Sequence, residues 1–230
     1  MRSVYRYCLL CCIAASLEAV PVVRYALDDP YELSPQDTPD VVEASTLMRG
    51  YGLRRNSLYG SFGSSGFNTS TDLASSQSMG DFFAFDFQVA AGQQVTLDQL
   101  SFDYRRDAYG PIRVALGLSR DGFAAEAFYL PPVSLSTPEG SVVFDFGGSV
   151  LPTLGAHETA TDVAVRLYLW SDPEATRSSG SFTFADLGAG ALRLDGNFSH
   201  MPEPAYLPLA FGLSGLTLGF LRRLRRRSTT

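Results

Sequence analysis

Between about Leu47 and Phe198, apolar residues recur at every second position, which is the spacing of a β-strand that buries one face. A change of phase near Asp98 and Gln99 predicts a β-bulge. No stretch keeps a helical stripe over three turns, so crossover helices are not expected. The alternation is found in residues 83–89, 95–102, 112–118, 128–130, 142–146, 163–169, 182–184 and 192–194. This pattern predicts an all-β fold, an antiparallel β-sandwich that is jelly-roll-like.

The residues before this region have a different composition. Residues 20–45 combine four prolines with several acidic residues, so we expect an extended, acidic, Pro-rich lead-in that buries little surface. Residues 57–79 are rich in Ser and Gly and predict a long loop or an irregular hairpin. We therefore assign the β-sandwich ectodomain to residues 46–199.

The first 19 residues have the order of a secretory signal peptide. Arg2 and Arg6 precede ten mostly apolar residues, and small residues follow where a signal peptidase would cut, after Ala19 or after Ser16. The apolar run is too short to span a bilayer. The alternative, a buried N-terminal helix, has nothing to continue into because Pro21 follows. We expect the chain to be exported.

Every cysteine of the chain, at positions 8, 11 and 12, lies inside this segment. An exported chain that has lost its signal peptide would hold no disulfide, no thiol nucleophile and no thiolate metal site. Neither Cys11 nor Cys12 follows the small residue that a lipidation site requires. Lysine is absent, which excludes Schiff-base chemistry and a P-loop lysine.

Residues 200–230 carry three signals in a fixed order. Pro202, Glu203 and Pro204 come first, and the apolar stretch 205–221 is long enough to form a single transmembrane helix. An arginine cluster follows, and the positive-inside rule would hold it in the cytoplasm. It consists of Arg222, Arg223, Arg225, Arg226 and Arg227.

This arrangement resembles the PEP-CTERM sorting domain of Gram-negative bacteria. The resemblance implies that Pro202, Glu203 and Pro204 form the motif recognised by an exosortase, a membrane protease, and that Arg222 to Arg227 act as a cytoplasmic stop. Met201 stands where the family most often has Val. Proteins of this family typically accompany exopolysaccharide. We expect transient anchoring in the inner membrane and then release to the cell surface or medium, with removal of the tail left open.

Charge is distributed unevenly along the chain. The net charge is −6, but between residues 20 and 204 there are 11 arginines and 23 acidic residues, so this body carries about −12. An acidic body without a basic stripe repels nucleic-acid phosphates. Nucleic acid is therefore not an expected partner.

Candidate catalytic groups are few. The two histidines, His157 and His200, fall in a polar turn and beside the sorting motif, and there is no Gly-x-Ser-x-Gly elbow for a serine hydrolase. A zinc site is not expected, because the mature chain would have no cysteine and its two histidines are not paired. We expect no cofactor, and Ca²⁺ in the acidic loops is the one ion left open, since no Asp-x-Asp-x-Asp-Gly loop occurs.

Two carboxylates at a suitable separation would be enough for a glycosidase. Asp103 and Asp107, or Asp172 and Glu174, are the pairs to consider, although each also fits exposed loop acids that keep a protein soluble. A small extracellular polysaccharide hydrolase on a jelly-roll scaffold is therefore the alternative function.

Sugar binding is the favoured function, because aromatic faces stack on sugar rings. Tyr168 and Trp170 share the phase of Arg166, opposite Val165 and Leu167, so they point either to an outer sugar-stacking face or into a second buried layer. Other aromatic candidates are Tyr104, Tyr109 and Tyr129. We expect a non-enzymatic surface or matrix protein that associates with exopolysaccharide.

Overall fold

The computed structural model describes residues 20–27, 29, 31, 33–36, 38–56, 61–67, 72–125, 127–147, 159–171, 180–187 and 192–200. The chain divides into two units, residues 1–199 and 200–230, and the description concerns the first. The expected signal peptide, the Pro202-Glu203-Pro204 motif, the apolar stretch 205–221 and the arginine cluster lie outside the described residues. Within the described ranges, no helix has the length and hydropathy that a bilayer crossing needs.

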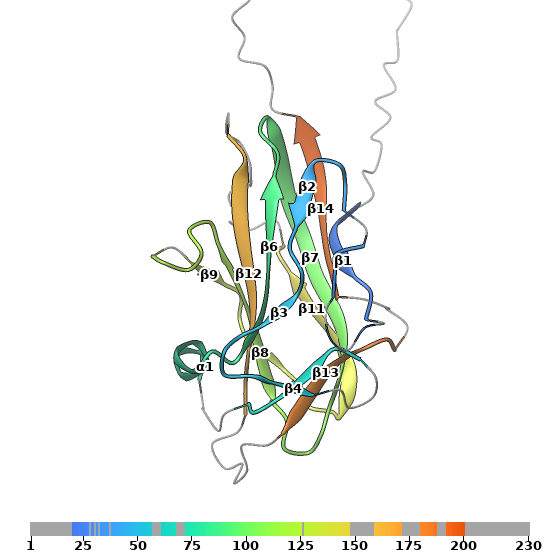
Figure 1. Cartoon of the computed structure of the whole chain (residues 1–230), viewed down its shortest axis with the longest axis vertical. Helices are drawn as coiled ribbons and strands as arrows, with labels where there is room; N and C mark the ends of the chain where they lie inside the picture. Colours follow the sequence, from blue (N-terminus) through green and yellow to red (C-terminus); the bar gives the residue numbers. More distant parts are fainter. Residues whose placement is uncertain are drawn as a thin grey trace, which may run out of the picture. The chain divides into compact units, whose positions relative to one another are not determined.

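The described body consists of two sheets of seven strands each and one short helix (Figure 1). The first sheet has, in spatial order, β1 (Val20–Tyr25), β14 (Leu192–His200), β7 (Gln93–Arg106), β13 (Ser181–Ala185), β5 (Gly63–Ser65) and β4 (Arg54–Asn56), with β11 (Glu139–Asp145) also paired to β7. The second has β10 (Val133–Ser134), β8 (Arg113–Ser119), β12 (Thr161–Trp170), β6 (Phe82–Val89) and β2 (Val42–Ala44), with β9 (Phe128–Tyr129) on β8 and β3 (Met48–Arg49) on β6. The helix is α1 (Leu73–Met79). Strand pairs such as β12–β6, β12–β8 and β11–β7 are antiparallel.

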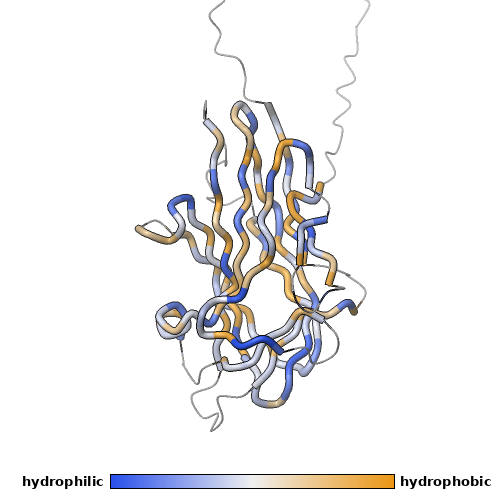
Figure 2. The backbone as a smooth tube through the Cα atoms, in the orientation of Figure 1, coloured by the Kyte–Doolittle hydropathy of each residue, from blue (hydrophilic) through white to orange (hydrophobic). Residues whose placement is uncertain are grey.

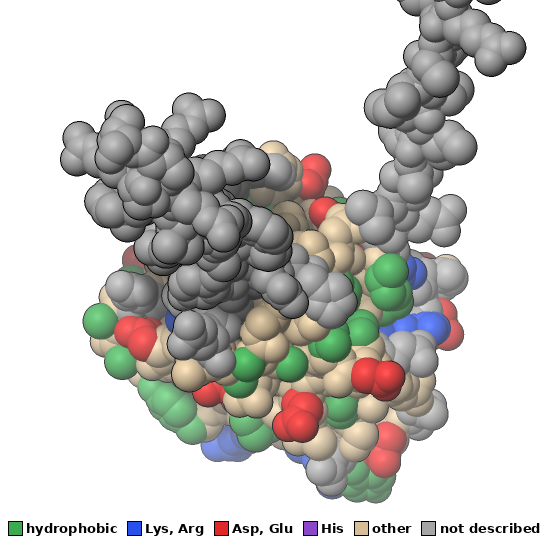
Figure 3. Space-filling model, turned by 90° about the horizontal axis from the view of Figure 1, so that it is seen from above, with side chains coloured by type: hydrophobic (Ala, Val, Ile, Leu, Met, Phe, Trp, Pro, Cys, Tyr) green, Lys and Arg blue, Asp and Glu red, His purple; other side chains and the backbone are tan. Residues whose placement is uncertain are grey.

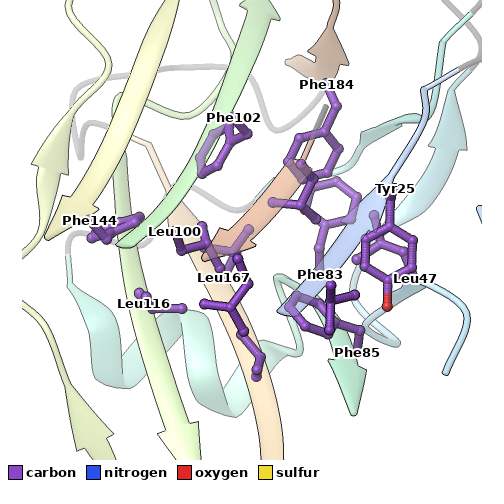
Figure 4. Close-up of a cluster of buried hydrophobic side chains, with 14 of the residues drawn as sticks. Tyr25, Leu47, Phe83, Phe85, Leu100, Phe102, Leu116, Phe144, Leu167 and Phe184 are labelled. Atoms are coloured by element: carbon purple, nitrogen blue, oxygen red, sulfur yellow. The ribbon is translucent and has the colours of Figure 1, made fainter. Parts of the chain in front are cut away.

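The larger of two buried hydrophobic clusters among the described residues lies between the sheets (Figure 4). Phe83 of β6 meets Phe182 and Phe184 of β13 across the core, with ring centroids 5.9 and 4.9 Å apart. Buried and more exposed residues alternate along β11 and the first half of β12, and hydrophobic and hydrophilic positions are interspersed along the strands in Figure 2. The expected all-β sandwich is therefore confirmed at the level of two packed antiparallel sheets.

The segments that alternate in the sequence are strands in the structure. Residues 83–89 lie in β6, 112–118 mostly in β8 and 163–169 in β12. Residues 95–102 belong to the long strand β7, in which the buried positions change phase between Leu97 and Leu100. The bulge at this point stays a prediction.

The expectation of a loosely packed lead-in is wrong for β1 and its continuation. β1 pairs with β14 along the edge of the first sheet, and its pairing shifts between Pro21 and Val23, where a proline is tolerated. Val22 and Tyr25 are fully buried, and the Tyr25 hydroxyl donates to the Ser45 carbonyl oxygen at 2.6 Å. The apolar residues between the prolines supply core surface that composition alone conceals.

The expectation of a long loop over residues 57–79 is also wrong in part. Phe62 and Phe67 are fully buried, and α1 follows. The helix begins at Asp72, whose Oδ1 accepts from the Ser75 amide at 2.8 Å, and ends at Gly80 in a left-handed conformation. α1 lies against β12 (Figure 1).

Candidate functional site

The outer face of the second sheet, opposite the core, carries the best candidate site. On β12, Val163, Val165 and Leu167 point into the core, so the alternate residues face outward. Arg166 lies between Gly117 of β8 and Ala84 of β6 in the antiparallel register. Gly117 and Ala84 are small, so they leave space on this face for larger side chains from neighbouring positions.

Aromatic rings surround the Arg166 guanidinium. Its central carbon lies 4.6 Å from the ring centre of Phe82 and 4.3 Å from that of Phe123. Nη1 approaches the Tyr168 hydroxyl at 3.4 Å and Nη2 approaches the Gly122 carbonyl oxygen at 3.5 Å, both long for hydrogen bonds. Within the described residues Arg166 forms no ion pair. Cation–π contacts therefore orient this charged group.

Phe123 reaches this position through a strained turn. Its φ of 70° places a bulky residue in the left-handed region, which only glycine occupies without cost. The Ser119 hydroxyl oxygen accepts from the Phe123 amide at 2.8 Å, and Asp121 accepts from the amides of Ala124 and Ala125. These bonds hold the turn between β8 and β9 so that the ring lies beside Arg166.

Tyr129 completes the group from β9. It lies opposite Gly117, and a Cβ at position 117 would be 2.8 Å from Tyr129 Cε1 and 3.0 Å from Phe123 Cε1. The missing side chain thus lets both rings cover the sheet. Tyr129 is 36% exposed, and its ring centroid is 6.1 Å from that of Tyr168. We call Phe82, Phe123, Tyr129, Arg166 and Tyr168 the Arg166 patch.

Two carboxylates lie on the same outer face as Arg166. Asp86 of β6 is paired with Ala164, and Asp162 accepts from Gln88 Nε2 at 2.6 Å. Partial burial raises the pKa of Asp86; the charge of Arg166 offsets part of this shift, and the charge of Asp162 adds to it. The face therefore offers hydrogen-bond donors and acceptors next to aromatic surface.

The structure corrects the expectation that Tyr168 and Trp170 form an exposed stacking surface. They are on the outer phase of β12, as expected, but only 2% and 6% exposed. Together with Ala115 they form a second buried cluster, against which Leu73 of α1, Phe82 and Phe123 pack. Of the two interpretations, an outer stacking face or a second buried layer, the second is confirmed for Tyr168 and Trp170. Burial also raises the pKa of the Tyr168 hydroxyl.

The other aromatic candidates differ in exposure. Tyr104 is buried in the core and stacked on Phe182, whereas Tyr109 and Tyr129 are exposed. Arg166 was not predicted to be a site residue, although its phase beside Tyr168 signalled an outward position. Phe123 carried only one signal, its place in the Asp121-Gly122 turn.

The sequence-predicted carboxylates have structural roles where they are described. Asp103 is fully buried and accepts from the Ser141 hydroxyl and the Leu187 amide. Asp107 accepts from the amides of Tyr109 and Ser181, both at 2.9 Å. Asp172 and Glu174 lie outside the described residues.

No metal-binding cluster of three or more His, Cys, Asp or Glu occurs within the described residues. His157 and the side chain of His200 lie outside them. Acidic side chains are spread among uncharged ones over the face seen in Figure 3. A Ca²⁺ site in the acidic loops stays a prediction.

Comparison with known proteins leaves the family open. No protein-family model matches the sequence, and no curated protein matches it. Among solved structures, TmCBM61 in complex with beta-1,4-galactotriose aligns with 53% of this chain at 9% identity and a TM-score of 0.24. The alignment covers 66% of that chain, slightly less than two thirds. A likeness at this level carries no argument about fold or function.

Proposed function

We propose that this chain is an exported, non-enzymatic protein of the cell surface or extracellular matrix that associates with exopolysaccharide. The observation that carries the binding role is the Arg166 patch, in which a partly exposed tyrosine lies across Gly117 from an arginine held by aromatic rings. Saccharides present both a C–H face and hydroxyl groups, and such a surface complements both. The successive strands β6, β7 and β8 alternate between the two sheets, which supports a jelly-roll-like connectivity.

The addressing part of the proposal rests on the two ends of the sequence. Signal peptidase would remove residues 1–19, and an exosortase would act at Pro202-Glu203-Pro204 while the helix 205–221 anchors the chain in the inner membrane. The described residues of β1 start at Val20, directly after the expected cleavage site at Ala19.

Mass spectrometry of the protein isolated from the native cell surface and medium tests this addressing. We expect an N-terminus at Val20 and loss of the sequence beyond the Pro202-Glu203-Pro204 region. A chain that retains its arginine-rich tail in the membrane fraction would show a permanently anchored protein instead.

Co-sedimentation of the mature protein with the cell's own exopolysaccharide tests the binding role. We expect the protein to sediment with the polymer and to be released after enzymatic digestion of the polymer. Protein that remains soluble at every polymer concentration would contradict this role.

One observation favours the alternative function, an extracellular polysaccharide hydrolase. Asp86 and Asp162 lie on one sheet face, and the pKa of Asp86 is raised, as general acids require. Release of reducing ends from exopolysaccharide measures this activity. Hydrolysis by the wild-type protein that is lost in Asp86→Asn would replace the binding role with the enzymatic one.

A further inference from the structure

We infer that the Arg166 patch is a subsite for a neutral hexose residue of a polysaccharide, with the C–H face of the sugar on Tyr129 and its hydroxyls between Arg166 and Asp86. This inference rests on the proposed function and adds the position of the site and the chemical class of its ligand. It follows from the support of the ring, the orientation of the cation and the charge around them.

The Tyr129 ring is open to solvent but supported from below. Phe123 and Tyr168 contact it at centroid distances of 6.5 and 6.1 Å, with ring planes inclined by 41° and 55°. Gly117 leaves the space that the ring occupies. A ring held in this way loses little conformational freedom on binding, which is the advantage of a preorganised aromatic contact.

Arg166 presents its donors from a fixed plane. A guanidinium has five N–H groups, and the described contacts of this one are two long hydrogen bonds and two ring contacts. The two rings fix the orientation of the planar guanidinium. A lysine, with a flexible chain and a non-planar ammonium group, would not present its donors in a fixed plane. Neighbouring hydroxyls of a sugar match such a fork of parallel donors.

Asp86 supplies acceptors on the same face. It is a diagonal neighbour of Arg166 across β6 and β12, on the opposite side of Ala84 from Phe82, which the guanidinium contacts, so that a ligand could span both charged groups. Its raised pKa reflects a partly desolvated carboxylate, which gains from hydroxyl donors. A cation and an anion on one sheet face suit hydroxyl groups, which both donate and accept.

Charge complementarity selects a neutral ligand over an acidic one. Asp86 and Asp162 lie close to the patch, and the body between residues 20 and 204 carries about −12. A polyanion such as a polyuronate would meet repulsion from both the local carboxylates and the whole body. A neutral polymer meets neither.

The strained turn supports a functional role for Phe123. Its left-handed backbone costs energy, and it is retained by bonds from Ser119 and Asp121 that do not stabilise any strand. The strain places a ring on one side of Arg166. Phe123 is thus a positioning residue for the guanidinium rather than a contact for the sugar.

The test uses the mature protein from the native cell surface, as wild type and as variants expressed in the same cells. The probe is the cell's own exopolysaccharide, separated by anion exchange into a neutral and an acidic fraction, and affinity is measured by electrophoresis in gels containing each fraction. We expect Tyr129→Ala and Arg166→Gln each to lower the affinity for the neutral fraction roughly tenfold or more. Tyr129→Phe should retain it, and Tyr109→Ala is the control for loss of an exposed tyrosine elsewhere.

Phe123→Ala tests positioning, because a merely structural role would lower stability and leave the affinity of the folded protein unchanged. We expect its affinity to fall while the remaining binding still prefers the neutral fraction. Near-wild-type affinity of Tyr129→Ala would overturn the subsite while binding to exopolysaccharide stands. If the protein prefers the acidic fraction, and salt abolishes this preference, the assignment of a neutral ligand is wrong. Absence of binding to both fractions would overturn the proposed function as well.

Discussion

Replacing Ser119 by alanine probes the support of the strained turn directly. The side chain is 5% exposed, and its hydroxyl donates to Asp121 Oδ1 at 2.7 Å. The same oxygen accepts from the amides of Asp121 and Phe123 at 3.1 and 2.8 Å. Ser119→Ala removes all three contacts while adding no volume.

The expected cost follows from these contacts. A hydrogen bond contributes about 1 kcal/mol net, and a buried amide left without an acceptor costs about 1–3 kcal/mol. The left-handed Phe123 stores strain of order 1–3 kcal/mol, part of which is released when the turn relaxes. We therefore expect the free energy of unfolding to fall by about 2 kcal/mol, which leaves a domain of typical stability folded.

Urea unfolding measures this change through Trp170, the one tryptophan of the chain, which is buried beside the patch. The midpoint should fall at an unchanged m-value. Ser134→Ala, at an exposed position of β10, is the matched control and should change stability by less than about 0.5 kcal/mol.

A double-mutant cycle separates strain from simple loss of contacts. In a Phe123→Gly background the positive φ is free of strain, so no strain is released when the turn relaxes, and Ser119→Ala should cost about 1 kcal/mol more than in the wild type. The reasoning would be refuted by a loss equal to that of Ser134→Ala, or by equal losses in both backgrounds.

Three further changes extend these expectations. Phe83→Ala removes a fully buried ring that contacts four other phenylalanines, so thermal or urea unfolding should show a loss of about 3–5 kcal/mol, against little change for the exposed Val143→Ala. Because the folded pKa of Asp86 is raised, its ionisation lowers stability as the pH rises from the unfolded pKa, and the cost is complete above the folded pKa. Asp86→Asn should therefore stabilise the protein at neutral pH and lose this advantage below about pH 4, the unfolded value, and a pH-independent effect would contradict the shift. Gly117→Ala should displace the rings above it and reduce polysaccharide binding, while the free energy of unfolding changes by less than about 1 kcal/mol in urea; unchanged binding would argue against the patch.

The strands of the sandwich core were predictable because alternation is a local property. A residue in β6 or β12 points to the face that its position in the strand dictates, and the core selects apolar residues on that face. The turn after β8 is also a local feature, because the pair Asp121-Gly122 is typical of turns and Gly122 adopts the positive φ that such turns favour.

β1 and α1 were missed for different physical reasons. β1 exists through its pairing with β14, so the residues that stabilise it are far away in the sequence. α1 has seven residues, too few to repeat a helical stripe, and its boundaries depend on the caps at Asp72 and Gly80. Composition, which suggested a lead-in and a loop, reports neither a distant partner nor a cap.

The candidate site divides in the same way. The sequence by itself determined that Arg166, Tyr168 and Trp170 lie on the outer face of one strand, because successive side chains of a β-strand point to opposite faces of the sheet. Only the tertiary structure decided that α1 and Phe123 cover Tyr168 and Trp170 while Tyr129 stays exposed. Exposure depends on which distant segments pack over a face, and that is a property of the assembled fold rather than of any local pattern.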